Sequence, residues 1–114
     1  MAFEVLVHPD VERDIEELPD IASFNEPWGE LYRELEQLEL EGPGALIGGV
    51  RVKNAPGMYL HQMKRDRLVA FVCSEHRQRF HIVSVSAPIS ENDWTGAGED
   101  AMRRLCAWLG LPPD

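Results

Sequence analysis

The stretch MYLHQMKRDRLVAFVCSEHRQRFHIVSVSA, residues 58–87, contains the pattern that decides the fold. It consists of three segments rich in β-branched and aromatic residues, which favour strands. These segments are 58–63, 67–73 and 79–87. The polar runs at 64–66 and 74–78 separate them and predict turns. We therefore expect an antiparallel β-meander, to which residues 50–54 (VRVKN) add a further strand ahead of a Pro-Gly turn.

Before the meander, the hydrophobic period changes from that of a strand to that of a helix. Apolar residues alternate over 2–8, which predicts a half-buried strand. Val11, Ile15 and Leu18 then recur at helical spacing, so we expect a helix over 11–18. A second amphipathic helix is expected at about 26–40. Its acidic face, which we expect to be solvated, consists of Glu30, Glu34, Glu36, Glu39 and Glu41.

After the meander, a last helix is expected at about 97–109. The resulting fold class is α+β: two N-terminal helices packed on an antiparallel β-meander (β-α-α-β-β-β) with an additional C-terminal helix. Residues 1–114 form one domain, whose core spans about 2–87. The second face of the sheet must be covered by the last helix, by a partner chain or by a ligand.

Composition narrows the class of protein. A chain of 114 residues is long enough to bury one core without metals or disulfides. Cys73 and Cys106 lie in apolar runs, so we expect them to be small hydrophobic side chains. No apolar run approaches the roughly 20 residues needed to cross a bilayer, and no basic leader precedes the first apolar stretch. We therefore expect a cytoplasmic protein without a membrane partner.

Charge is distributed unevenly along the chain, although the net charge is -9. Residues 1–50 carry 13 acidic and two basic side chains, and residues 82–114 carry five and two. Residues 51–81 reverse this balance, with seven basic and two acidic side chains. Because a ligand responds to the local field, this basic segment is the candidate for contact with an anionic partner.

The histidines do not have the spacing of a metal site. His61, His76 and His81 form none of the usual ligand pairs on one element, and Cys-x-x-Cys and His-Glu-x-x-His motifs are absent. We expect His81 on the solvated face of its strand and His8 at the surface or capping a helix. No phosphate-binding loop is present. No metal and no cofactor are therefore expected.

Five stretches of the chain form a recognisable series: His8–Pro19, Arg51-Val52-Lys53, Gly57-Met58-Tyr59-Leu60, Asp66–Phe71 and His81–Val85. In their residues and in element order over about residues 2–87, they resemble the RelE/ParE toxin superfamily of bacterial toxin–antitoxin modules. The resemblance implies a toxin that is partnered by a cognate antitoxin protein. In the ribonuclease branch, it also implies a translation-inhibiting endoribonuclease that cuts mRNA on the ribosome by attack of a 2′-hydroxyl on the adjacent phosphate.

Such chemistry needs cations beside the phosphate and a group that transfers a proton. By resemblance, the catalytic candidates are Arg67 and Lys53. His61 joins them, although the family usually has an arginine at this position; it is either the acid or base or an exposed polar residue. The candidates for substrate binding are Tyr59, Arg51, Lys64 and Arg65. If the face of Tyr59 and His61 coincides with that of Arg67, Val69, Phe71 and Cys73 across the hairpin, these residues flank a phosphate and stack a base. Alternatively, Lys64, Arg65 and Arg67 only solubilise an exposed hairpin edge.

The chain departs from the ribonuclease pattern after its last strand. Ala87-Pro88-Ile89-Ser90 stands where that branch has basic or aromatic residues. The ParE branch, which inhibits DNA gyrase, is compatible with this loss. The alternative function is therefore a catalytically degenerate protein-binding or regulatory module. Leu105, Trp108 and Leu109 of the last helix offer a surface for a homodimer or, alternatively, pack on the chain's own sheet.

Overall fold

A computed structural model of the chain describes residues 4–18, 27–42, 44, 49–53, 57–62, 69–75 and 79–110. Five strands and three α-helices are present in these ranges. In chain order they are β1 (Glu4–Val7), α1 (Val11–Glu16), α2 (Pro27–Glu41), β2 (Val50–Arg51), β3 (Met58–Gln62), β4 (Val69–Glu75), β5 (Arg79–Ser86) and α3 (Trp94–Leu109). The fold is α+β, as the sequence predicts.

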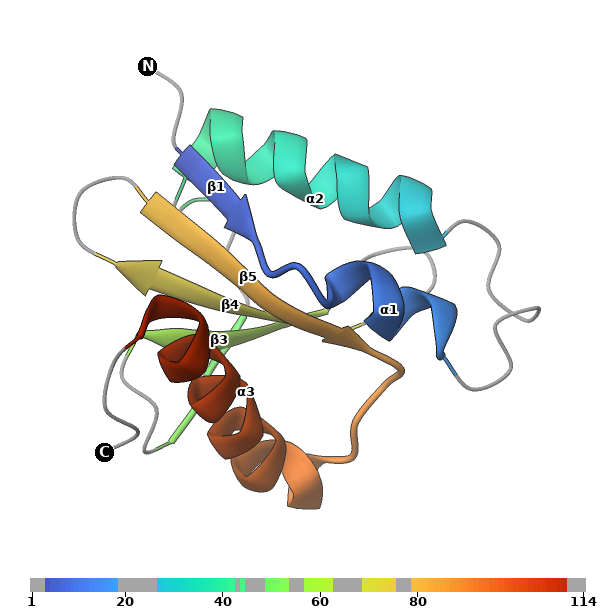
Figure 1. The fold of residues 1–114 in the computed structure, drawn as a ribbon, viewed down its shortest axis with the longest axis vertical. Coiled ribbons are helices and arrows are strands. Elements are labelled where there is room, and N and C mark those ends of the chain that lie inside the picture. Colours follow the sequence, from blue (N-terminus) through green and yellow to red (C-terminus); the bar gives the residue numbers. More distant parts are fainter. Residues whose placement is uncertain are drawn as a thin grey trace.

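The strands form one mixed sheet in the order β1-β5-β4-β3-β2 (Figure 1). β2 to β5 make the expected antiparallel meander, in which β2 is the further strand expected at 50–54. β1 pairs in parallel with β5, and the His8 N–H extends the pairing by donating to the Ile82 carbonyl oxygen at 2.9 Å. The wholly antiparallel β-α-α-β-β-β arrangement is therefore corrected. The alternating pattern of residues 2–8 predicts a strand but does not encode which strand it will adjoin or in which direction.

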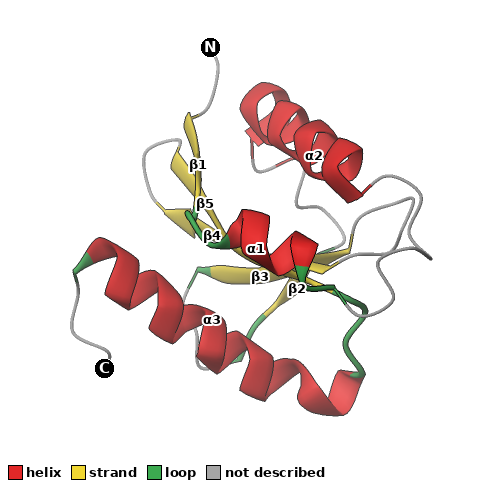
Figure 2. Ribbon diagram, turned by 45° about the vertical axis from the view of Figure 1, so that its right-hand side comes forward, coloured by secondary structure: helices red, strands yellow, loops and turns green. Residues whose placement is uncertain are grey.

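The two N-terminal helices cover one face of the sheet, and α3 covers the other (Figures 1 and 2). On the first face, Val11, Ile15 and Leu38 pack with Val72 and Ile82. On the second face, the residues in contact are Met58, Leu60, Val69, Phe71, Cys73, Val83, Ala101 and Leu105. The last helix is thus what covers the second face. Cys73 and Cys106 are buried, as expected for small hydrophobic side chains.

Several element boundaries differ from the expected ones. β4 continues to Glu75, so Ser74 and Glu75 belong to the strand rather than to the turn expected at 74–78. α3 begins at Trp94, three residues earlier than expected, directly after a 3-10 turn at Glu91–Asp93. The Trp94 indole N–H donates to the Ile89 carbonyl oxygen at 3.0 Å, which anchors this helix start. Among the described residues, no helix is long and apolar enough to cross a membrane.

Candidate functional site

Two of the predicted site residues, Tyr59 and His61, lie on the face of β3 that α2 covers. Tyr59 pairs with Val72 and His61 pairs with Ala70, and both partners belong to the core beneath the N-terminal helices. Directly paired residues in an antiparallel ladder point to the same face of the sheet. Tyr59 and His61 therefore point toward α2 rather than toward open solvent, and both are half-buried.

The expected common face across the hairpin is not the observed one. Val69, Phe71 and Cys73 pair with Gln62, Leu60 and Met58, so they lie on the α3 face, opposite Tyr59 and His61. A register shift of one residue reverses the face of every side chain on a strand, and spacing alone does not define the register. The predicted residues Lys64, Arg65 and Arg67 lie outside the described residues, as does His76.

His61 forms an ion pair with Glu34 of α2. The distance between His61 Nε2 and Glu34 Oε2 is 2.9 Å, and the two side chains are 14% and 7% exposed. Glu30, one turn earlier on α2, is also buried. The expectation that all five glutamates of α2 are solvated is therefore wrong for these two. A buried carboxylate needs a polar partner, and at Glu34 this partner is His61, on a strand distant in the sequence.

The remaining predicted residues, Arg51 and Lys53, lie at the border of the sheet where β2 follows β3. Arg51 is in β2, and Lys53 is in the turn that follows it. Both are exposed. Arg51 pairs with Tyr59, so the structure places Arg51 beside two other predicted residues, Tyr59 and His61. Next to Arg51 and Lys53 is a cavity of about 130 Å³, which extends to Trp94 at the start of α3.

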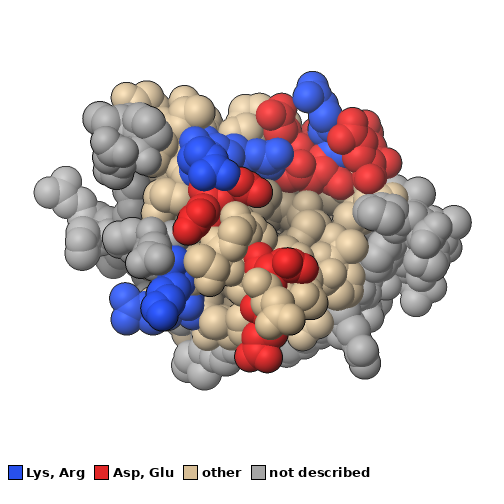
Figure 3. Space-filling view, turned by 90° about the horizontal axis from the view of Figure 1, so that it is seen from below, with Lys and Arg blue, Asp and Glu red and all other residues tan. Residues whose placement is uncertain are grey.

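Figure 3 views the molecule from below and shows how charge is distributed on that face. The Lys and Arg side chains form separate groups with Asp and Glu side chains beside them. The described part of this face is therefore not one continuous basic surface of the kind that binds a long phosphate backbone.

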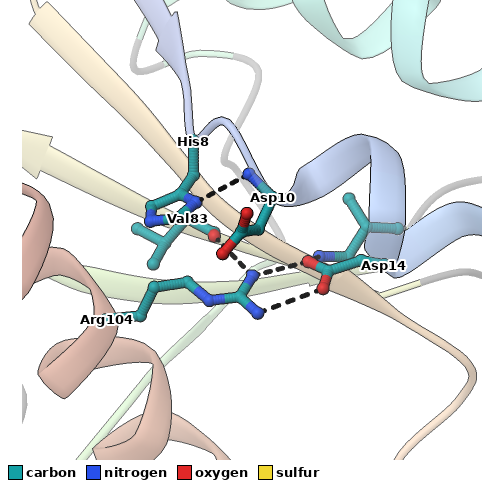
Figure 4. Close-up of polar contacts among 6 residues, drawn as sticks. His8, Asp10, Asp14, Val83 and Arg104 are labelled. Atoms are coloured by element: carbon teal, nitrogen blue, oxygen red, sulfur yellow. Dashed lines mark hydrogen bonds and ion pairs between the residues drawn. The ribbon is translucent and has the colours of Figure 1, made fainter.

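A polar cluster that sequence reasoning missed connects α1, β5 and α3 (Figure 4). Arg104 binds the Asp14 carboxylate through both terminal nitrogens: Nη1 lies 2.6 Å from Oδ2, and Nη2 lies 3.1 Å from Oδ1. Nη1 also donates to the Val83 carbonyl oxygen at 3.2 Å, while the Val85 N–H donates to Asp14 Oδ2 at 3.2 Å. The hydrogen bond to Asp14 raises the pKa of Arg104, so the guanidinium group stays charged.

Two histidines adjoin this cluster. His8 Nδ1 accepts the Asp10 N–H at 3.0 Å, which means that its other ring nitrogen bears the proton in the neutral form. Burial lowers the pKa of His8, and the positive charge of Arg104 lowers it further. The rings of His8 and His81 both meet the Trp108 indole edge-on, with centroid distances of 5.0 and 5.2 Å.

The prediction that His81 lies on the solvated face of its strand is wrong, because this residue is only 2% exposed. Phe80 and Ile82 point toward the N-terminal helices, so His81 points to the other face, as alternation requires. The sequence indicates that alternation, but it gives no sign that Trp108 of α3 covers this position. Asp14 and Arg104 are 90 residues apart, and no local motif relates them.

In both of these polar sites, the side chains that could act on a ligand already bind each other. Arg104 is bound by Asp14, and His61 is bound by Glu34. Within the described ranges, no group of three or more His, Cys, Asp or Glu side chains is arranged to hold a metal ion. In comparisons with known proteins, no family model, no curated protein and no solved structure matches the chain.

Proposed function

We propose that the chain is a RelE/ParE-like toxin component that acts by binding a protein partner rather than by cutting RNA. The observation that supports this proposal is the ion pair between His61 and Glu34 beneath α2. The partner is a cognate antitoxin, a protein target or both. The motifs shared with the RelE/ParE superfamily are the basis for the class of protein.

A general acid or base must come within hydrogen-bond reach of the proton that it transfers. His61 Nε2 is instead bound to Glu34, and its side chain is 14% exposed. Arg51 and Lys53 are exposed at the sheet border. Ala87-Pro88-Ile89-Ser90 supplies no further cation or aromatic ring after the last strand. These observations favour contact with a protein over phosphodiester cleavage.

The RelE-like endoribonuclease is the second candidate, and the same ion pair favours it in one respect. A carboxylate that orients a histidine is a recurrent arrangement in acid–base catalysis. In that function, His61 transfers the proton while Arg51 and Lys53 bind the phosphate. Arg67, which lies outside the described residues, would join them. The two candidates make opposite predictions for transcripts and for His61 variants.

The deciding experiment expresses the intact chain in bacterial cells, alone and together with the product of the neighbouring gene. We expect the two proteins to co-purify with a defined stoichiometry and we expect transcripts to stay intact. Transcript cleavage by the unmodified chain that His61→Asn abolishes, with the variant still folded by circular dichroism, contradicts the proposal and establishes the nuclease. Absence of a complex with the neighbouring product contradicts the antitoxin-binding form of the proposal.

A further inference from the structure

We infer that the outer edge of β2 binds an extended, acidic segment of a partner protein, which adds to the sheet as a further strand. The inference rests on the proposed protein-binding function and assigns its surface. β2 is the last strand in the sheet order, and within the described ranges β3 is the only strand that pairs with it. An exposed sheet edge of this kind is a recurrent docking site for extended peptides.

The backbone of Arg51 faces this open edge. Hydrogen-bonded and non-hydrogen-bonded pairs alternate along an antiparallel ladder. The Val52 N–H donates to the Met58 carbonyl oxygen at 2.9 Å, so the preceding pair, Arg51 and Tyr59, is non-hydrogen-bonded. The N–H and C=O of Arg51 therefore point away from β3. They offer an added strand one donor and one acceptor, so side-chain contacts must supply most of the affinity.

A cavity beside the same edge offers a place for an apolar side chain. It measures about 130 Å³ and lies between β2 and the start of α3, with Val50, Val52, Leu60 and Trp94 among its walls. Val50 is 37% exposed. Val52 and Leu60 pack on the α3 side of the sheet, so an added strand would reach the cavity with the side chains that it points to that face.

The charges at the edge select an acidic partner. Arg51 and Lys53 are exposed, and in the described part of the chain no ion pair involves either side chain. Charges more than about 8 Å away are largely screened at physiological ionic strength, so nearby charges matter more at this edge than the net charge of -9, and Arg51 and Lys53 are exposed cations there. Glu91 borders the cavity, which disfavours acidic side chains on the α3 side. The segment that fits alternates acidic residues toward Arg51 with apolar residues toward the cavity.

The test uses a fluorescein-labelled peptide of four Glu-Val repeats, which is titrated with the intact chain and followed by fluorescence anisotropy. We expect saturable binding, together with slower hydrogen exchange at the Arg51 amide. Arg51→Pro removes the outward N–H, and proline is tolerated at such edge positions. This variant, and the double variant Arg51→Glu with Lys53→Glu, should each weaken binding about tenfold or more, or about 1.4 kcal/mol.

Arg13→Glu is the matched control, because Arg13 is an exposed cation on α1, away from the edge, and this variant should bind the peptide normally. Unchanged affinity in both edge variants overturns the inference, as does equal affinity for a Lys-Val peptide. Tighter binding of a uridine oligonucleotide that depends on the same two residues also overturns it. If the neighbouring gene product still co-purifies with Arg51→Pro, the edge is not its binding surface, but the proposed function stands. If the peptide binds at the edge but no complex with the neighbouring gene product forms, the inference about the edge stands and the antitoxin-binding form of the proposed function fails.

Discussion

Among single residues, His61 and Glu34 show how one contact between distant elements can bury two side chains that are usually solvated. A carboxylate in a helix face and a histidine in a strand are usually solvated. Here both side chains are mostly buried between α2 and the sheet, with His61 Nε2 and Glu34 Oε2 2.9 Å apart. Removing one partner from such a pair leaves the other buried with a lost contact, which costs more than removing both.

This asymmetry can be measured by a double-mutant cycle. We expect His61→Leu to lower the free energy of unfolding by about 1–3 kcal/mol, the usual range for a buried group that loses its partner. The double variant His61→Leu with Glu34→Leu should lose less than the sum of the two single variants. Urea denaturation monitored by circular dichroism gives the three values. Strict additivity would show that the two side chains are not energetically coupled.

His8 predicts a dependence of stability on pH. Burial and Arg104 lower the pKa of His8 in the folded state, so in the pH range just below the ordinary pKa the unfolded chain binds more protons than the folded chain. The contribution of His8 to stability is therefore present above about pH 6.5 and is lost as the pH falls through the lowered folded pKa. Urea denaturation at pH 7.5 and 5.5 should give a smaller loss of stability for His8→Asn than for the unmodified chain. An equal loss in both proteins would contradict the assignment.

At the scale of elements, α3 is held against the sheet by contacts distributed along its length. Its apolar side packs Ala101 and Leu105 on the sheet, and Arg104 connects it to Asp14 of α1. Near its start, Gly98 lies so close to Val52 that a Cβ atom built at this position overlaps Val52 Cγ1. The absence of a side chain at position 98 therefore sets the distance between α3 and the border of the sheet.

The two glycines of α3 offer a matched comparison. Gly98→Ala should destabilise the protein by about 1–3 kcal/mol, because the added methyl group overpacks a filled site. Gly96→Ala should stabilise it by up to about 1 kcal/mol, since alanine is the better helix former and nothing lies within 4 Å of its Cβ position. Thermal unfolding of both variants checks the difference in sign. Stabilisation by both substitutions would mean that Val52 moves aside without cost.

At the scale of the whole molecule, helices cover both faces of the sheet (Figure 2), and among the described residues β2 is the last strand at one border. Two of the three α3 residues that the sequence offers for a homodimer surface pack inside the molecule instead. Leu105 is buried, and Trp108 packs with the core under α3 and meets the rings of His8 and His81. Leu109, 36% exposed, is the remaining apolar residue of the three.

We therefore expect a monomer in solution. Light scattering coupled to gel filtration should give a mass near the 12.9 kDa of the chain. A mass of twice that value, reduced to the monomer by Leu109→Glu, would contradict this prediction and support the homodimer formed through α3. A dimer that persists in this variant would place the contact elsewhere on the molecule.

Much of the fold could be predicted because its signals are local. The stripe of Val11, Ile15 and Leu18 predicts α1, and all three residues are buried as that pattern requires. The β-branched and aromatic residues of 79–87 likewise predict β5, which spans Arg79–Ser86. The candidate site was less predictable, because the role of His61 depends on Glu34, 27 positions earlier, and the surroundings of Arg51 depend on Trp94.

Local patterns in the sequence were enough to predict the α+β class, the two N-terminal helices, the meander and the basic character of residues 51–81, since periodicity, turn residues and charge are properties of neighbours along the chain. The folded molecule was needed to find the parallel pairing of β1 with β5, the burial of Glu34 and His81, and the contact between Asp14 and Arg104. Each of these depends on strand order, register or helix placement. Contacts between distant segments form only when many weak interactions are satisfied together, so no single stretch of the sequence specifies them.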